Sequence, residues 1–226
     1  MKKNISNFEK NLLTNYICLF SSIFTFIIIA VLVSKNITNN LDYFVLLSFR
    51  NPVNKYLPIG PSWLLDFFKD ATSLGGLTIV ALISVITVGI LIITHRRFVL
   101  RVFLISVILG GVSDLILKEI FSRQRPSVIP HLVQVNTFGF PSGHATMSVV
   151  IYFSIVLIVI YSGVNKKLKT YLLWTAVFLV LIIGISRIYL GVHYPTDILA
   201  GWSLGMFWIS IEWILIKTKS KLNFEF

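Results

Sequence analysis

The sequence predicts an all-α, polytopic membrane protein with six transmembrane helices, both termini in the cytoplasm and a short interfacial helix in the first outer loop. The first observation behind this prediction is composition: 56% of the 226 residues are hydrophobic and only 13% are charged, with a mean hydropathy of +0.85. A soluble domain carries roughly a quarter charged residues. The second observation is a series of six apolar runs, each about as long as a helix that crosses a bilayer.

The six runs are bounded by charged or turn residues. They cover about residues 12–33, 71–94, 98–117, 145–162, 170–186 and 198–216. Together with short loops they fill the chain, so we expect residues 1–226 to form a single integral membrane domain. The first run follows Lys2 and Lys3, as the apolar part of a signal peptide does, but it is long and lacks a small-residue cleavage site before Lys35. This pattern favours a retained helix.

Lysine and arginine are unevenly distributed between the two sides of this arrangement. Twelve lie at the termini and beside the loops after the second and fourth runs, and eight lie on the other side. Because short cytoplasmic loops carry the excess of basic residues, we expect a multi-pass protein of the cell membrane with the loops after the first, third and fifth runs outside. The net charge of +11 is clustered beside apolar runs, where it meets lipid headgroups, so we expect no nucleic-acid partner.

The first outer loop, residues 34–70, contains Pro52, Pro58 and Pro61 and is therefore not another span. Ser62 is placed to cap a short helix in which four apolar residues share one face: Leu64, Phe67, Phe68 and Ala71. This face predicts a helix that lies at the outer membrane interface, either as a packed cover over the bundle or as a lid over a site.

Polar and ionisable residues gather at three places along the chain, each at the outer end of a span. Such groups are costly beside an apolar core, and they mark a candidate functional site. The first group follows the third run, the second begins the fourth, and the third connects the fifth and sixth. The groups comprise Lys118, Arg123, Arg125 and Pro126; Pro141, Ser142, Gly143 and His144; and Ser186, Arg187, His193 and Asp197.

In the first group, Lys118 and Arg125 are seven residues apart. If the third helix continued as far as Pro126, which would end it, both side chains would lie on nearly the same face. Two fixed cations suit a phosphate group, although such a pair can also anchor a helix at the membrane interface. Asp114, one turn before Lys118, is expected to pair with it and hold it in place.

The second group begins a helix, where free backbone N–H groups and the helix dipole favour an anion. Gly143 permits close approach of the backbone to such an anion. Ser142 is either an ordinary N-cap or an anion ligand, because both roles use the same geometry. His144 can donate a proton near neutral pH, which makes it a candidate acid.

In the third group, Pro195 can open the sixth helix, which leaves His193 just ahead of it and Asp197 in its first turn. The carboxylate would then accept the proton of one ring nitrogen, so that the other nitrogen presents its lone pair. This arrangement suits a nucleophile or a base. A buried His–Asp pair without a chemical role is the alternative.

The histidines of the second and third groups, together with Asp197, are also candidate metal ligands. Three basic residues in the same groups would repel a dication, and they already supply the positive charge that a metal would offer to a phosphate. These residues are Lys118, Arg125 and Arg187. We therefore expect no catalytic metal and no other cofactor.

The three groups form the motifs Lys118-x6-Arg125-Pro126, Pro141-Ser142-Gly143-His144 and Ser186-Arg187-x5-His193-x3-Asp197. Their order, internal spacing and placement at span ends resemble the type 2 phosphatidic acid phosphatase superfamily, which includes membrane-integral lipid phosphatases. The resemblance covers the chain from about the second span to the end, and the amino-terminal 70 residues agree only in outline. Soluble vanadium haloperoxidases and acid phosphatases share this site, but six spans argue against both.

The resemblance implies a role for each matching position. His193 would attack phosphorus and form a phosphohistidine, with Asp197 orienting it, while His144 would protonate the leaving oxygen and later activate water. The phosphoryl oxygens would be held by Lys118, Arg125, Arg187, Ser142 and the backbone at Gly143. Every position of the pattern is present, so an active, metal-independent enzyme is expected.

The resemblance also implies a lipid phosphate substrate, whose chain stays among the membrane lipids while its headgroup reaches the site. The first expectation is hydrolysis of undecaprenyl pyrophosphate to undecaprenyl phosphate at the outer face, followed by phosphatidylglycerol phosphate and phosphatidic acid. A lipid phosphotransferase is a further alternative. A non-catalytic lipid-binding protein would not need His193 and Asp197, and a transporter would place ionisable residues in the middle of its spans.

Overall fold

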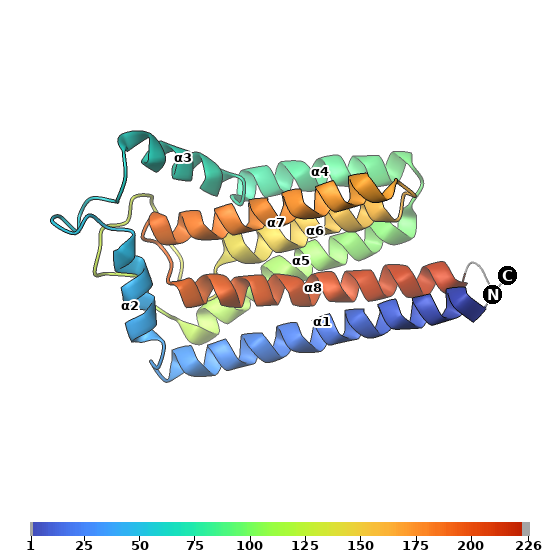
Figure 1. Cartoon of the computed structure of the whole chain (residues 1–226), viewed down its shortest axis with the longest axis horizontal. Helices are drawn as coiled ribbons and strands as arrows, with labels where there is room; N and C mark the ends of the chain where they lie inside the picture. The colour runs from blue at the N-terminus through green and yellow to red at the C-terminus, as the bar shows by residue number, and fades with distance from the viewer. Residues whose placement is uncertain (1, 223–226) are drawn as a thin grey trace.

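The computed structural model describes residues 2–222, with side chains from residue 12 to residue 219. Within this range the chain forms eight α-helices and no β-strand, which confirms the all-α prediction. The helices are α1 (Lys2–Ser34), α2 (Asn39–Ser48), α3 (Ser62–Ser73), α4 (Leu77–Ile93), α5 (Arg97–Phe121), α6 (Gly143–Ile160), α7 (Lys166–Tyr189) and α8 (Pro195–Leu222) (Figure 1). Four lysines of the topology count have side chains outside the described ones: Lys2, Lys3, Lys10 and Lys221.

Five helices are each long and apolar enough to cross a membrane, namely Leu12–Ser34 within α1, the whole of α5, α6 and α7, and Pro195–Lys219 within α8. α3 and α4 meet the same criterion only as a pair, with a bend of 42° between them. The second expected span, residues 71–94, is therefore not one straight helix. It is broken at Gly75 and Gly76, because glycine loses the most backbone freedom on entering a helix.

The first outer loop holds two helices rather than the single one that was expected. The predicted cap was wrong, because Ser62 is the first residue of α3, the N-cap position is Pro61, and no side chain caps the helix. Phe68 and Ala71 are buried and α3 packs on α7, so α3 is a packed cover over this end of the bundle. α2 was not expected, because its ten residues are too few to give a clear helical pattern.

α8 lies in the middle of the bundle, where it contacts α1, α5 and α6. Figure 1 shows the long helices side by side, with both termini and the α4–α5 and α6–α7 connections at one end. The opposite end carries α2, α3 and the α5–α6 and α7–α8 connections. The three polar groups of the sequence therefore share this second end.

Glycines on α8 allow α6 and α8 to pack with their backbones in contact. A Cβ atom added at Gly201 would lie 2.6 Å from the Ser142 carbonyl oxygen, and one added at Gly205 would lie 2.7 Å from the Thr146 carbonyl oxygen. Small residues are the usual means by which helices in membranes approach this closely. The N-termini of the two helices meet as a result, and the Ser142 N–H donates to the Asp197 carbonyl oxygen at 3.0 Å.

Candidate active site

The three polar groups converge on one pocket at the ends of α5, α6, α7 and α8. The pocket has a volume of about 370 Å³, and residues 133–137 of the α5–α6 connection form one wall. Six of the eight expected site residues line it: Lys118, Arg125, Gly143, His144, Arg187 and His193. The other two, Ser142 and Asp197, are fully buried beside them.

His193 lies in the α7–α8 connection and is 1% exposed. Its Nδ1 is 3.3 Å from Asp197 Oδ2, and its Nε2 is 3.0 Å from Arg125 Nη1. Because a guanidinium can only donate, Nε2 is the nitrogen with the lone pair and Nδ1 carries the proton. Burial, and then the positive charges of Arg125 and Arg187, hold the pKa of His193 well below its usual 6.5. The imidazole is therefore neutral at physiological pH, as a nucleophile must be.

Lys118 is 5% exposed and ties the end of α5 to the start of α6. Its Nζ is 3.0 Å from Asp114 Oδ2, which confirms the expected pair, and it also donates to the Pro141 carbonyl oxygen. A Cβ atom at Gly143 would lie 2.9 Å from the same Asp114 oxygen. Glycine is therefore required at this position for the carboxylate and the helix N-terminus to approach.

Arg125 does not share a helix with Lys118, so the prediction of one continuous helical face was wrong. α5 ends at Phe121, well before Pro126, and Ser122 adopts the left-handed conformation with φ 42°. Arg125 reaches the pocket from the α5–α6 connection instead. Its guanidinium is fixed there by donating to the carbonyl oxygens of Thr137 at 2.6 Å and Val192 at 2.7 Å.

Two buried polar groups at the pocket have unused hydrogen-bonding atoms among the described residues. Ser142 holds the N-cap position of α6, but its hydroxyl accepts no capping hydrogen bond and is buried without a partner. Arg187 is 4% exposed and donates from Nη1 to Thr72 Oγ1 at 2.8 Å, while its Nε has no partner. Buried polar atoms normally find a partner, so these atoms suit the oxygens of a bound phosphate.

The family comparison agrees with this geometry. Residues 99–221, more than half of the chain, match the model of the PAP2 superfamily. The chain belongs to the PAP2 superfamily. All three motifs lie within the matched residues, and the type 2 phosphatidic acid phosphatase resemblance that they predicted is confirmed.

Two curated PAP2 relatives are similar in sequence to part of the chain. The chain is 39% identical over 92 residues to Phosphatidylglycerophosphatase B of Bacillus subtilis, which is 40% of this chain and 45% of that protein. It is 28% identical over 126 residues to Undecaprenyl-diphosphatase of Sulfolobus acidocaldarius, 54% of each chain. These matches span about half the length of the curated relatives.

A solved PAP2 structure extends the likeness to the whole fold. The crystal structure of the transmembrane PAP2 type phosphatidylglycerolphosphate phosphatase from Bacillus subtilis superimposes with a TM-score of 0.76 at 25% identity. The match covers 90% of this chain and 96% of that one. The chain therefore has the multi-pass helical fold of a PAP2 membrane protein.

Three residues that contribute to the PAP2 site were missed in the sequence. Thr72 of α3 lines the pocket and accepts from Arg187. Arg123 belongs to the first polar group of the sequence, where nothing assigns it a role, and Asp42 of α2 pairs with it at 2.7 Å. Asp42 and Thr72 lie outside the residues matched by the PAP2 model. The signal for Asp42 was its position as the single charged residue of an otherwise apolar and neutral segment, residues 39–48.

The pocket of this PAP2 protein is positively charged. Its lining holds three cations against the single carboxylate of Asp114, which leaves two positive charges when both histidines are neutral. Among the residues that the structure describes, no three of the His, Cys, Asp and Glu side chains are grouped to hold a metal ion. The oxygens of Asp197, the carboxylate nearest to His193, are occupied by Arg123, the Tyr194 N–H and His193 Nδ1.

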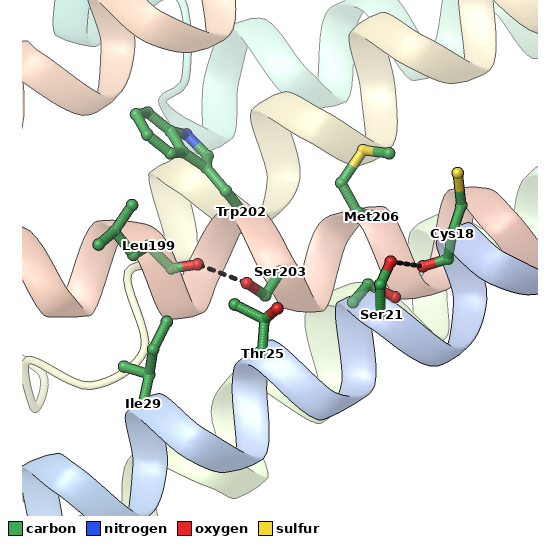
Figure 2. A pocket seen from close by; sticks show the side chains of 9 residues that line it. Cys18, Ser21, Thr25, Ile29, Leu199, Trp202, Ser203 and Met206 are labelled. Carbon is green, nitrogen blue, oxygen red and sulfur yellow. Dashed lines mark hydrogen bonds between the residues drawn. The ribbon is translucent and has the colours of Figure 1, made fainter.

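A second cavity, of about 320 Å³, lies between α1 and α8 and is separate from the PAP2 site (Figure 2). Its nine lining residues are all uncharged and include Cys18 and Thr25 of α1 and Trp202 and Ser203 of α8. The hydroxyl of Ser203 donates to a carbonyl oxygen of its own helix, as Figure 2 shows. This cavity lacks the cations that a phosphate needs, so the phosphate chemistry is assigned to the first pocket.

Proposed function

We propose that this PAP2 protein hydrolyses a lipid phosphate or pyrophosphate through a phosphohistidine intermediate and without a metal ion. The observation that carries the proposal is the neutral His193, whose Nε2 lone pair faces a pocket with three cations. Fixed cations around a nucleophile stabilise a phosphoryl group during transfer. The names of the two curated relatives, a phosphatidylglycerophosphatase and an undecaprenyl-diphosphatase, support the same class of reaction.

In the first step, the phosphoryl group binds among the basic side chains and takes over the Arg125 N–H that faces Nε2. The His193 Nε2 lone pair then forms the N–P bond while the bond from phosphorus to the leaving oxygen breaks. His144 is protonated in this step and donates that proton to the leaving oxygen, because the oxygen leaves more readily as a neutral hydroxyl or as a protonated phosphate. Nδ1 of His193 keeps its proton and donates it in a hydrogen bond to Asp197, whose carboxylate stabilises the positive charge that develops on the ring.

In the second step, His144 is neutral and can accept a proton from a water molecule. The water oxygen attacks phosphorus, the N–P bond breaks, and inorganic phosphate leaves with the electron pair returned to Nε2. His193 is thereby regenerated in its original tautomer, since the hydrogen bond between Nδ1 and Asp197 is kept throughout. Lys118, Arg125 and Arg187 supply in both steps the positive charge that a metal ion supplies in other phosphatases.

We place the pocket at the outer face of the cell membrane, with both termini inside. The larger count of basic residues, twelve against eight, belongs to the end that carries the termini. Leu115 of α5 lines the pocket and is 59% exposed on the side of the bundle. A lipid chain can therefore remain in the bilayer beside α5 while its phosphate enters the site.

Undecaprenyl pyrophosphate is the first substrate that we propose, supported by the motifs and by the Sulfolobus relative. Phosphatidylglycerol phosphate is the second substrate that we propose. The Bacillus relative and the Bacillus structure support this second candidate.

The test is phosphate release in EDTA by the detergent-purified protein and by its His193→Ala variant. Undecaprenyl pyrophosphate, phosphatidylglycerol phosphate and phosphatidic acid are compared side by side. His95→Asn is the matched control, because His95 lies at the opposite end of the bundle with a positive φ that asparagine tolerates. We expect release by the wild type and by His95→Asn, and a loss of at least about 1000-fold in His193→Ala.

Three outcomes would contradict the proposal. Equal release by His193→Ala would exclude the phosphohistidine. Loss of activity in EDTA that a divalent ion restores would exclude metal-independent chemistry. Absence of release from every lipid, with the protein folded, would point to a phosphotransferase or a lipid-binding protein.

A further inference from the structure

A buried ionic network lies behind the His193–Asp197 pair and connects it to the first outer loop. Its members are Asp42 of α2, Arg123 of the α5–α6 connection, and Thr196 and Asp197 at the start of α8. Asp42 and Asp197 are both 0% exposed, and Thr196 is 4% exposed. None of the four lines the pocket, so none of them is placed to touch a bound phosphate directly.

Asp42 holds the first turn of α8 from another helix. Its Oδ1 accepts the Thr196 backbone N–H at 3.1 Å, and its Oδ2 accepts the Thr196 hydroxyl at 2.7 Å. The same Oδ2 also accepts from Arg123 Nη2 at 2.7 Å. A carboxylate at free N–H groups of a helix N-terminus is favourable. Asp42 therefore fixes the turn that carries Asp197 and fixes the guanidinium that contacts it.

Arg123 bridges the two carboxylates. Its Nη1 donates to Asp197 Oδ1 at 2.5 Å and to the Thr196 hydroxyl at 2.8 Å. Burial alone lowers the pKa of Arg123, but Asp197 and Asp42 outweigh burial and raise it above its ordinary value, so the guanidinium stays charged. The Cζ atom of Arg123 lies 4.4 Å from the centre of the Tyr194 ring, and this cation–π contact restricts the guanidinium further.

Both oxygens of Asp197 are consequently fixed. Oδ1 is held by Arg123, while Oδ2 accepts the Tyr194 N–H at 2.9 Å and faces His193 Nδ1. A carboxylate held in this way cannot rotate away from the imidazole. The orientation of His193 thus depends on a side chain of α2, which lies outside the residues that match the PAP2 model.

We propose that Asp42 and Arg123 are positioning residues for phosphoryl transfer, which act on His193 by fixing the place and the charge of Asp197. This inference rests on the proposed function. If Arg123 paired with Asp197 alone, its positive charge would cancel the negative charge of that carboxylate. Asp42 pairs with the same guanidinium, so the cancellation is incomplete. Two carboxylates around one cation leave a net negative charge, which stabilises the positive imidazole ring that forms when Nε2 attacks phosphorus.

The effect on His193 has to be separated from the other charges that face it. These come from every element around the pocket: Asp114 and Lys118 from α5, Arg125 from the α5–α6 connection, His144 from α6, Arg187 from α7 and Asp197 from α8. None of them is changed in the variants below. A shift in the titration of His193 is then due to the network alone.

The experiment uses Asp42→Asn, Arg123→Gln and the double variant, with Asp66→Asn on α3 as control because its side chain is 76% exposed. We expect each single change to lower kcat about 10- to 100-fold, as is typical of groups that orient a ligand or nucleophile, with little change in KM. The acid limb of the pH profile of kcat/KM should move in opposite directions in the Asp42 and Arg123 variants. Loss of the Asp42 charge lowers the pKa of His193, and loss of the Arg123 charge raises it, each by about one pH unit.

The double variant distinguishes positioning from a structural tie between α2 and α8. Because it removes one negative and one positive charge, the limb should return close to that of the wild type. The same lipid is used throughout, so that titration of the substrate cancels in the comparison. Arg123→Lys keeps the charge but loses the two-pronged geometry, and it should lower kcat without moving the limb.

A readout without substrate keeps this inference separate from the proposed function. The side-chain ¹⁵N shifts of His193, titrated by NMR in detergent, should show the same opposite displacements. If they do while no lipid releases phosphate, the proposed function fails and the coupling stands. Two results would overturn the positioning role. One is active single variants in which the pKa of His193 does not move, and the other is a double variant in which the acid limb is displaced as far as in the more displaced single variant. If one single variant does not fold, the direction of the shift in the other decides.

Discussion

Ser142 is a single residue whose place in the sequence fits two roles, a helix N-cap and a ligand of a bound phosphate. It occupies the N-cap position of α6 with an extended ψ of 113°, yet its hydroxyl caps none of the described N–H groups. A buried hydroxyl without a partner costs free energy in the folded protein. Asn165 of α7, by contrast, is a working N-cap whose side-chain oxygen accepts the Leu168 N–H at 2.9 Å. Substitution by alanine is therefore expected to have opposite effects at Ser142 and at Asn165.

Ser142→Ala should leave the free energy of unfolding unchanged or slightly raised, because it removes an unpaired buried hydroxyl. It should also lower kcat/KM for the lipid phosphate about tenfold, since one hydrogen bond to the phosphoryl group is lost. Asn165→Ala should lower the free energy of unfolding by about 1 kcal/mol and leave kcat/KM unchanged. Thermal unfolding in detergent and phosphate release measure the two effects. A stability loss in Ser142→Ala equal to that in Asn165→Ala would show that Ser142 is only a cap.

At the scale of helices, the site depends on how closely α6 and α8 approach. Gly205 leaves no room for a methyl group, because its Cβ would lie 2.6 Å from Val149 Cβ. The two N-termini carry Ser142 and Asp197, which are joined by a backbone hydrogen bond. Any separation of the helices is therefore transmitted to the pair that orients His193.

Gly205→Ala should lower the free energy of unfolding by about 1–3 kcal/mol, as overpacking does in other cores. It should also lower kcat/KM by roughly 100-fold, because a displacement of about 1 Å at the reacting groups is enough for such a loss. Gly89→Ala in α4 is the matched control, since the added methyl group would have no atom within 4 Å apart from the adjoining backbone of its own helix. Equal stability and activity of the two variants would show that the contact between α6 and α8 does not determine the site.

The sequence predicts the helices that have a long apolar pattern and the motifs whose members lie close together in the chain. It misses α2, whose ten residues are short, and the break at Gly75 and Gly76 within an apolar run. The same limit applies at the site. His193 and Asp197 are four residues apart, so the sequence predicts them as a pair, whereas Asp42 is 154 residues away from Thr196 and reaches it only through tertiary packing. A partner of this kind has no local sequence pattern, because the contact depends on where α2 docks.

At the scale of the whole molecule, the two ends of the bundle differ in what they carry. One end has the termini and two short connections with basic residues beside them, and the other has the pocket, α2, α3 and the long α5–α6 connection (Figure 1). Basic residues near short loops are retained in the cytoplasm during insertion. This rule supports the outward pocket that we propose, which would give the site access to lipid phosphates of the outer leaflet.

Single cysteines in a Cys18→Ser background test this orientation, because Cys18 is the only cysteine of the chain. Val53→Cys lies at the pocket end, where Val53 is 95% exposed, and Lys167→Cys lies at the other end on an exposed position of α7. In intact cells, a membrane-impermeant maleimide should label Val53→Cys and should label Lys167→Cys only after permeabilisation. Phosphate release by both variants shows that they are folded. The reverse labelling pattern would place the pocket in the cytoplasm and would require a substrate lipid of the inner leaflet.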